Sequence, residues 1–295
     1  MSRIPKVLKD IYVLRERYLK FATGKSDLLR IITEAELPEH VYNSNAIENS
    51  TLTLEETEKI LLQLDLDRFI SEREIFEAKN LGRVFDYIEK RAPEKELDRD
   101  TILFIHKMLL SNIRDDVAGR FRIGNEYVRV GSHIGASPTD IEKLITDMIV
   151  EYKSNVHQHI VSRIAKLHLT FENIHPFVDG NGRIGRVIIN YLLIREGYVP
   201  INIKFMDRTR YYDAFKEFDT TGKTIIMEEI VGRALTNSYY KRLAYLEDLK
   251  IVLLDEYAKI SKQSYSNALN KAKRQTIPAF LEKGVWKVGL ERKEI

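Results

Sequence analysis

Cysteine is absent from the 295 residues of this chain. Without thiols, neither a disulfide nor a thiolate-bound zinc ion or iron–sulfur cluster can form. No apolar run approaches the length that a membrane-spanning helix needs, and charged residues occupy the place where a signal peptide would have its apolar core. The sequence therefore predicts a protein without membrane segments, and a reducing cytoplasm is the expected compartment.

A strong net charge is also missing, because the formal value is only +3. So small a charge does not by itself indicate a nucleic-acid partner. The charge is unevenly distributed, however, since residues 259–295 hold nine Lys or Arg and three Glu and therefore carry +6, against −3 for the rest. A hydrophobic share of 44% and a charged share of 31% are ordinary for a protein with a sizeable buried core.

The densest group of chemically useful side chains lies between two predicted buried helices, at 160–174 and 187–194. It is the run His-Pro-Phe-Val-Asp-Gly-Asn-Gly-Arg-Ile-Gly-Arg at residues 175–186. Gly180 and Gly182 permit a tight turn and a close approach of the backbone to a ligand. The free amides at a helix N-terminus then form a site for an anion.

Four side chains of this run supply the remaining chemistry. Arg183 and Arg186 are three residues apart, so both can point from one helix face toward an anion. Asp179 is an oxygen ligand of the kind that Mg²⁺ uses beside substrate phosphates, and His175 could take a proton near neutral pH. The residues alone thus indicate a phosphate and metal pocket with a base at its edge, although a surface turn is the alternative for Asp-Gly-Asn-Gly.

The run resembles the full signature of the Fic family, His-x-Phe-x-Asp/Glu-Gly-Asn-Gly-Arg-x-x-Arg, at every position. Members of that family typically transfer AMP from ATP to a protein hydroxyl. The resemblance implies that His175 is the base for the incoming hydroxyl and that Asp179 binds Mg²⁺. It implies that the phosphates of ATP are bound by Gly180, Asn181, Gly182, Arg183 and Arg186, the last at the γ-phosphate.

A second resemblance concerns Ser-Asn-Ala-Ile-Glu-Asn at residues 44–49. Seen alone, it would be an unremarkable helix segment with a solvated Glu48. It matches the inhibitory motif of Fic proteins, Ser/Thr-x-x-x-Glu-Gly/Asn, and its place before the core implies self-inhibition from the N-terminal side. Ser44 and Glu48 are then inhibitory residues, and Glu48 is expected to pair with Arg186. In some relatives the same glutamate supports removal of AMP, so the direction of the reaction stays open.

One pair of strands is predicted in the helical core, at residues 121–131, because β-formers flank the turn signal Gly124-Asn125. Fic proteins carry a β-hairpin flap at this point of the chain, and it docks the target segment as an added strand. The resemblance implies that one edge of the flap holds the target side chain against His175. That edge consists of Tyr127, Val128, Arg129 and Val130. A hairpin without such a role is the alternative.

The expected contact with adenine rests on the resemblance as well. Fic proteins commonly have two consecutive tyrosines after the motif helix, and the second one, beside the adenine, corresponds to Tyr212. Asp219 stands where several relatives have an Asn that bonds the base. Because an ionised carboxylate accepts hydrogen bonds but cannot donate them, the base selectivity is open.

Residues 259–295 resemble the small winged-helix-like module at the end of some bacterial Fic proteins. In such a module Lys271, Lys273 and Arg274 could contact phosphates. A basic solvated cap anchored by Trp286 is an equal alternative.

The sequence thus predicts a mainly α-helical Fic fold, a helical bundle around the motif helix with a β-hairpin flap, plus a small C-terminal winged-helix-like domain. Long helices are expected at 3–36 and within 224–260. The predicted domains are an N-terminal helical region at 1–95, the Fic core at 96–220, bridging helices at 221–258 and the C-terminal module at 259–295.

The expected activity is transfer of AMP from ATP, with Mg²⁺, to a Ser, Thr or Tyr hydroxyl of a protein, suppressed by Glu48. Two other functions stay open, namely removal of AMP by means of Glu48 and a DNA-binding regulator whose Fic domain senses the nucleotide. The expected partners are a protein substrate and a second copy of the chain packed through helical surfaces. No membrane partner is expected, and nucleic acid only through residues 259–295.

Overall fold

The computed structural model describes residues 6–130 and 133–291. Packing divides the chain into two compact units. The core unit comprises Leu37–Tyr198 and Asn202–Val231, and the terminal unit comprises Val199–Ile201 and the described residues up to Glu36 and from Gly232 onward. The domain boundaries expected at 95, 220 and 258 stay predictions.

Twelve α-helices dominate the described residues, so the mainly helical class is confirmed. None of them combines the length and the apolarity that a membrane crossing requires. The elements of the core unit are α3 (Leu54–Leu61), α4 (Glu72–Arg91), α5 (Arg99–Leu110), β1 (Arg129–Val130), β2 (His133–Ile134), α6 (Ile141–Ser154), α7 (Ile160–Ile174), α8 (Asn181–Arg195), the 3₁₀-helix η1 (Phe205–Asp207) and α9 (Arg208–Thr221). Those of the terminal unit are α1 (Lys6–Ala22), β3 (Lys250–Leu253), α11 (Leu254–Ile260), α12 (Tyr265–Lys273), β4 (Ala279–Glu282) and β5 (Val285–Leu290), while α2 (Ser26–Ile47) and α10 (Ile225–Leu246) contribute to both units.

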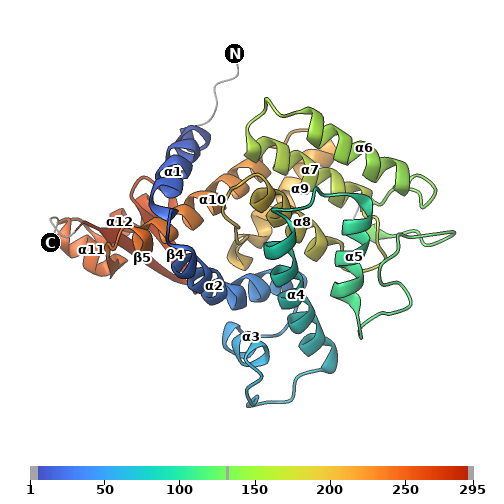
Figure 1. The fold of residues 1–295 in the computed structure, drawn as a ribbon, viewed down its shortest axis with the longest axis horizontal. Helices are drawn as coiled ribbons and strands as arrows, with labels where there is room; N and C mark the ends of the chain where they lie inside the picture. Colours follow the sequence, from blue (N-terminus) through green and yellow to red (C-terminus); the bar gives the residue numbers. More distant parts are fainter. Residues whose placement is uncertain (1–5, 131–132, 292–295) are drawn as a thin grey trace. The chain divides into compact units, whose positions relative to one another are not determined.

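α8 is the central helix of the core unit (Figure 1). It packs against α4, α5 and α7, and α7 packs in turn against α6 and α9. The apolar side chains of α8 are buried on all sides, as expected for a helix that other helices enclose. Because α8 cannot move without disturbing this packing, groups at its N-terminus have a rigid support.

α3 begins with a capping box. Thr53 Oγ1 accepts a hydrogen bond of 3.1 Å from the Glu56 amide, and Glu56 Oε2 accepts one of 2.8 Å from the Thr53 amide. The reciprocal pair satisfies two backbone donors that a helix start leaves free.

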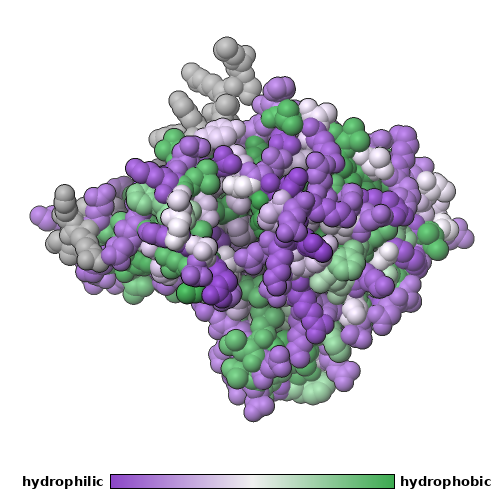
Figure 2. All heavy atoms as spheres, viewed as in Figure 1, coloured by the Kyte–Doolittle hydropathy of each residue, from purple (hydrophilic) through white to green (hydrophobic). Residues whose placement is uncertain are grey.

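Exposed apolar side chains gather in the loop that follows α3. Leu62, Leu64 and Phe69 are 67%, 56% and 89% exposed. Figure 2 shows hydrophobic residues at the bottom of the view, where α3 lies in Figure 1, while much of the rest of the visible face is hydrophilic. Apolar patches of this kind mark contact surfaces, but the expected homodimer stays a prediction.

The hairpin predicted at 121–131 is wrong in its position. β1 pairs with β2, with Arg129 opposite Ile134, so the two strands flank residues 131–132, and Gly131 lies outside the described residues. Gly124-Asn125 does form a turn, closed by a hydrogen bond of 3.0 Å from the Glu126 amide to the Ile123 carbonyl. The two flanks of this turn form no ladder with each other, because the buried Arg122 guanidinium takes the Glu126 carbonyl that a paired strand would use.

The terminal unit contains an antiparallel sheet in the order β3-β5-β4, which shares an apolar core with α11 and α12. Two expectations are wrong here. Gly24, with φ 75°, separates α1 from α2 within the single helix expected at 3–36. Residues 250–253, expected to be helical, form β3, because they pair with β5 after the positive φ of Asp248 has turned the chain.

Candidate active site

A short loop joins α7 to α8, as the sequence predicts. The residues at both of its ends have a left-handed backbone conformation. His175 ends α7 with φ 50° and ψ 61°, and Gly180 precedes α8 with φ 83°. A left-handed histidine costs about 1–2 kcal/mol, which surrounding contacts must offset. The loop places the histidine only six residues before α8, whose first amides have no acceptor within the helix.

Asn181 fastens this loop from inside. Its side-chain oxygen accepts a hydrogen bond from the Phe177 amide, and its side-chain nitrogen donates one to the Phe177 carbonyl, both at 2.9 Å. Both ends of the side chain are therefore occupied, and the residue is buried. The side-chain amide of Asn181 is thus not available for the predicted contact with phosphate, and its backbone amide is the group that could make this contact.

His106 of α5 holds the same loop from outside, a role that the sequence does not reveal. Its Nδ1 accepts a hydrogen bond of 2.9 Å from the Gly119 amide, so Nε2 carries the proton and donates to the Asp179 carbonyl at 3.1 Å. The ring stacks on Phe177 with 3.7 Å between the centroids. Burial lowers the pKa of His106 to about 4, which keeps this arrangement neutral at physiological pH.

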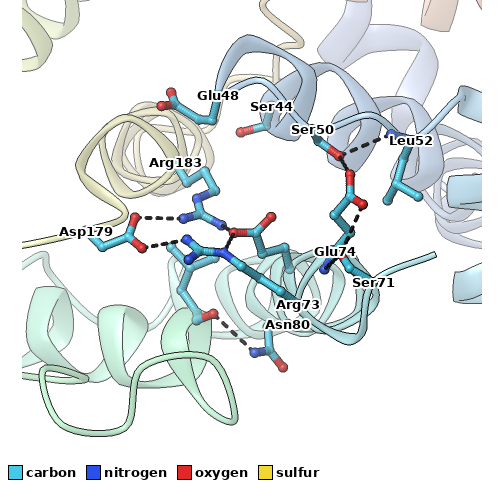
Figure 3. Close-up of polar contacts among 12 residues, drawn as sticks. Ser44, Glu48, Ser50, Leu52, Ser71, Arg73, Glu74, Asn80, Asp179 and Arg183 are labelled. Atoms are coloured by element: carbon cyan, nitrogen blue, oxygen red, sulfur yellow. Dashed lines mark hydrogen bonds and ion pairs between the residues drawn. The ribbon is translucent and has the colours of Figure 1, made fainter.

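Asp179, the predicted metal ligand, lies in a cluster of charged side chains (Figure 3). Its Oδ1 accepts a hydrogen bond of 3.1 Å from Arg183, and its Oδ2 accepts one of 2.8 Å from Arg73 of α4. Glu77 Oε1 lies 3.0 Å from Arg183 Nη1 and 3.1 Å from Arg73 Nε. Burial alone would raise the pKa of Asp179, but the two arginines hold it below its usual range. Arg73 and Glu77 have no local sequence signal, because the fold brings them here from a distant helix.

Two groups of the cluster can still bind ligands, the Arg183 guanidinium an anion and the Asp179 carboxylate a cation. Arg183 Nε is buried and has no hydrogen-bond partner in the part of the chain that the structure describes. No cluster of three or more His, Cys, Asp or Glu that could hold a metal occurs within the same ranges. One carboxylate nevertheless suits Mg²⁺, because this ion keeps several waters and takes its other ligands from substrate phosphates. Asp179 therefore fits a cation that arrives with a polyphosphate.

His175 presents one nitrogen as a base. Its Nδ1 lies 3.3 Å from the Glu172 carbonyl, an acceptor, so Nδ1 carries the proton and Nε2 has the free lone pair. Burial, and to a smaller degree the positive charge of Arg122, lower the pKa of His175 to about 4. The imidazole is therefore neutral and able to accept a proton at physiological pH.

Glu172 places a second ionisable group beside this histidine. Its Oε2 lies 3.9 Å from His175 Nδ1, and its Oε1 is buried without a hydrogen-bond partner among the described residues. Burial and the neighbouring Glu48 carboxylate raise the pKa of Glu172 to about 8. The carboxyl group is thus mostly protonated at neutral pH, which lets it remain buried without an ion-pair partner.

Arg186 is buried and fully engaged by the end of α2. Its Nε donates to Ser44 Oγ at 2.9 Å, while its Nη2 donates to the Ser44 carbonyl at 2.8 Å and to Glu48 Oε1 at 2.9 Å. Nη1 donates to the hydroxyl of Tyr211 at 3.3 Å. Burial alone would lower the pKa of Arg186, but Tyr211 and Glu48 raise it above its ordinary value. The two residues expected to be inhibitory thus meet the arginine expected to bind the γ-phosphate.

The backbone at the end of α2 fixes the direction of Glu48. The Ser50 amide donates to the Asn45 carbonyl and the Asn49 amide to the Ala46 carbonyl, and Asn49 is left-handed with φ 70°. These are the bonds of a Schellman ending, in which Gly or Asn is favoured at the left-handed position. The requirement for Gly or Asn after the glutamate therefore has a backbone cause.

Glu48 lies against the N-terminus of α8. A Cβ atom on Gly182 would be 2.2 Å from Glu48 Oε1 and 3.1 Å from Arg186 Nη1. Only a glycine leaves room for this carboxylate beside the helix start, where the free amides and the helix dipole favour an anion. The carboxylate thus lies in the region where the sequence predicts phosphate.

The two consecutive tyrosines differ in their surroundings. Tyr211 is buried and bonded to Arg186 and to His168 Nε2, whereas Tyr212 is 39% exposed and donates to the Ile47 carbonyl at 3.3 Å. Asp219 Oδ1 accepts a hydrogen bond of 2.8 Å from Asn173. Tyr212 therefore borders α2, and its predicted contact with adenine stays a prediction.

The flap, defined here as residues 126–130 and 133–136, lies next to the loop of His175. The Gly135 amide donates to the Val128 carbonyl at 3.1 Å, and the Ala136 amide to the Ile174 carbonyl at 3.0 Å. Tyr127 and Arg129 are exposed, Val128 is half-buried, and the backbone of Val130 pairs with His133. The docking role of this edge stays a prediction.

Comparison with known proteins adds to this geometry. Residues 96–193 match the Fic/DOC family. The chain is 32% identical over 213 residues to a protein of Nematostella vectensis named protein adenylyltransferase Fic, covering 70% of this chain and 49% of the relative. It spans about half the length of the curated relatives it matches.

Two solved structures share the fold. A Fic domain-containing signaling protein of Bacteroides thetaiotaomicron has a TM-score of 0.73 and 22% identity, covering 82% of this chain and 98% of its own. A Fic family protein of Desulfovibrio desulfuricans has a TM-score of 0.68 and 20% identity, covering 98% of this chain and 97% of its own. At these identities the likeness establishes the architecture, including the part after residue 193.

Proposed function

Residues 96–193 form a Fic/DOC family domain, and on this premise we propose that the chain is a protein adenylyltransferase whose ATP site is closed by Glu48. The relatives named protein adenylyltransferase Fic support this activity. The observation that carries the proposal is the junction of α7 and α8. Within six residues it combines a neutral histidine base, a carboxylate for a cation and a helix N-terminus for phosphate.

His175 would begin the reaction. Its Nε2 takes the proton of a Ser, Thr or Tyr hydroxyl on the target protein as the hydroxyl oxygen attacks the α-phosphorus of ATP. The bond from that phosphorus to the bridging oxygen breaks, and pyrophosphate leaves. A positioned base of this kind contributes roughly 10²–10⁴-fold to the rate.

The residues of α8 would hold the polyphosphate. The backbone amides of Asn181 and Gly182 and the guanidinium of Arg183 lie at the helix start, where their charge and dipole favour an anion. Asp179 would hold Mg²⁺, which when bound neutralises part of the phosphate charge. Arg186 would bind the γ-phosphate.

Glu48 inhibits in this proposal because it occupies Arg186 and the space beside Gly182. A γ-phosphate in that place would meet a carboxylate of like charge. The side chain of Glu48 is 36% exposed and that of Arg186 only 5%. Glu48 is therefore the partner that can leave, while the buried Arg186 stays in place.

The test follows α-phosphate label from ATP onto lysate proteins and onto the chain itself. Three proteins are compared: wild type, Glu48→Gly and Glu48→Gly with His175→Ala. We expect strong labelling only by Glu48→Gly. Equal labelling by wild type and Glu48→Gly would refute self-inhibition, transfer of γ-label instead of α-label would indicate a kinase, and loss of AMP from a labelled target that requires Glu48 would indicate the reverse reaction.

We propose, in addition, that α11, α12 and the sheet β3-β5-β4 form the winged-helix-like module expected from the sequence. The order of helix, helix and β-hairpin along 254–290 supports it. Lys273 and Arg274 are exposed at the end of α12 and would contact phosphates. Binding of the full chain to duplex DNA with a steep salt dependence would support this role, and its absence at low salt would refute it.

A further inference from the structure

Arg122 directs all of its side-chain hydrogen bonds to backbone carbonyls. The residue is 1% exposed. Nε donates to His175 at 2.8 Å, and Nη1 donates to Glu126 at 2.8 Å. Nη2 donates to Ala136 at 2.7 Å and to Ile174 at 3.3 Å. Within residues 6–130 and 133–291, no carboxylate forms an ion pair with this guanidinium, and the Glu126 carboxylate pairs with Arg120 instead.

These carbonyls belong to two different segments. Ile174 and His175 form the end of α7 and the start of the motif loop, whereas Glu126 and Ala136 are the first and last residues of the flap. The backbone adds two parallel links, from the Arg122 amide to the Pro176 carbonyl and from the Ala136 amide to the Ile174 carbonyl, both at 3.0 Å. One guanidinium thus joins the motif loop to both sides of the flap.

The energetic cost of burying Arg122 indicates that its side chain is there for its directed hydrogen bonds and not merely to fill space. Burial of a cation without a direct ion-pair partner is costly, and burial lowers the pKa of Arg122 although the negative charge of Glu126 opposes the shift. A well-packed apolar side chain would fill the same space at a lower cost. Only the planar fork of arginine can reach four carbonyls in fixed directions, since a lysine ammonium is a single point of contact.

We propose that Arg122 is a positioning residue that locks the loop of His175 to the flap, so that the base and a hydroxyl docked on the flap keep one relative placement. The roles of base and docked hydroxyl rest on the proposed function, whereas the lock itself does not. The same cation also faces the imidazole and disfavours its protonation, which keeps His175 in its basic form.

Hydrogen exchange tests the lock without nucleotide. Arg122→Lys keeps the charge and Arg122→Met removes it. As a control, Arg114→Met removes an arginine of the same segment whose side chain is 41% exposed. We expect exchange at least tenfold faster in both Arg122 variants, at Gly135 and Ala136 of the flap and at His175 together, with α8 unchanged. Faster exchange in the flap alone, or in neither segment, would overturn the proposal. If Arg122→Met does not fold, Arg122→Lys decides.

Kinetics separate positioning from nucleotide binding. In the Glu48→Gly protein, we expect Arg122→Lys to lower the rate of self-labelling from α-phosphate-labelled ATP at least tenfold, with the Kd for ATP unchanged within twofold. An unchanged rate, or a loss of ATP binding that accounts for the whole effect, would contradict it. If Glu48→Gly itself labels nothing while the exchange result holds, the proposed function fails and the lock remains.

Discussion

Glu74 Oε1 accepts a hydrogen bond of 2.7 Å from the amide of Thr51, three residues after Glu48. The same oxygen accepts from the hydroxyls of Thr51 at 2.9 Å and of Ser50 at 3.3 Å, and Oε2 accepts from the hydroxyl of Ser71 at 3.1 Å. Figure 3 shows this carboxylate between Ser50 and Ser71. Glu74 thereby fixes the chain that follows the inhibitory residue to the first turn of α4.

Removal of this anchor should weaken inhibition without touching the pocket. Hydrogen bonds to a charged acceptor contribute about 1.5–3 kcal/mol each. If about 0.7–1.4 kcal/mol of this favours the inhibiting position of Glu48, Glu74→Ala should raise labelling from α-phosphate-labelled ATP by roughly 3–10-fold. Glu72→Ala, an exposed residue of the same helical turn, is the control. Adding Glu74→Ala to Glu48→Gly should change nothing further, and a similar gain in both backgrounds would show that Glu74 acts elsewhere.

Arg73 should compete with the cation for Asp179. Its side chain is 56% exposed, so its ion pair is worth about 0–1 kcal/mol. In the Glu48→Gly background with a non-hydrolysable ATP analogue, Arg73→Met should therefore bind Mn²⁺ up to about fivefold more tightly. Electron paramagnetic resonance of free Mn²⁺ measures this Kd, with Arg83→Met on the same helix as the control. Weaker binding in Arg73→Met would mean that Arg73 supports the metal site instead.

Glu172 should make stability depend on pH. Its pKa rises from 4.5 to about 8 on folding, so its contribution is complete below about pH 4.5 and is lost as pH rises toward 8. Glu172→Gln lacks this dependence, and its free energy of unfolding relative to wild type should increase between pH 5 and pH 8.5. Urea unfolding measures the difference, with the exposed Glu151→Gln as the control. A constant difference across this range would show that Glu172 is ionised in the folded protein.

Two parts of the site were predicted from the sequence, on different grounds. The motif loop between two helices and the pairing of Glu48 with Arg186 were both expected, and both are present in the structure. The loop follows from turn chemistry and from the helical patterns on either side. The pairing came from a resemblance, since nothing in residues 44–49 alone distinguishes Glu48 from a solvated acid.

The remaining groups of the site come from long-range packing. His106 lies 73 residues and Arg73 lies 106 residues before Asp179, which each contacts, and Arg122 lies 53 residues before the His175 carbonyl that it contacts. A lone histidine or arginine on a helix or turn has no periodicity that marks its partner. The prediction placed the hairpin wrongly for the same reason. The turn signal of Gly124-Asn125 is local, whereas the hydrogen bond from Arg122 to the Glu126 carbonyl depends on the burial of Arg122.

The contacts of Arg186 have a thermodynamic consequence. If ATP and the end of α2 compete for one guanidinium, their binding energies are linked, and the linkage is reciprocal. If a partner protein draws Ser44 and Glu48 away and so raises the affinity of this chain for ATP by some factor, bound ATP must raise the affinity of the chain for that partner by the same factor. An activating partner would then bind this chain most tightly when the ATP concentration is high. The contact of α2 with α8 would therefore respond to the ATP concentration as well as inhibit the enzyme.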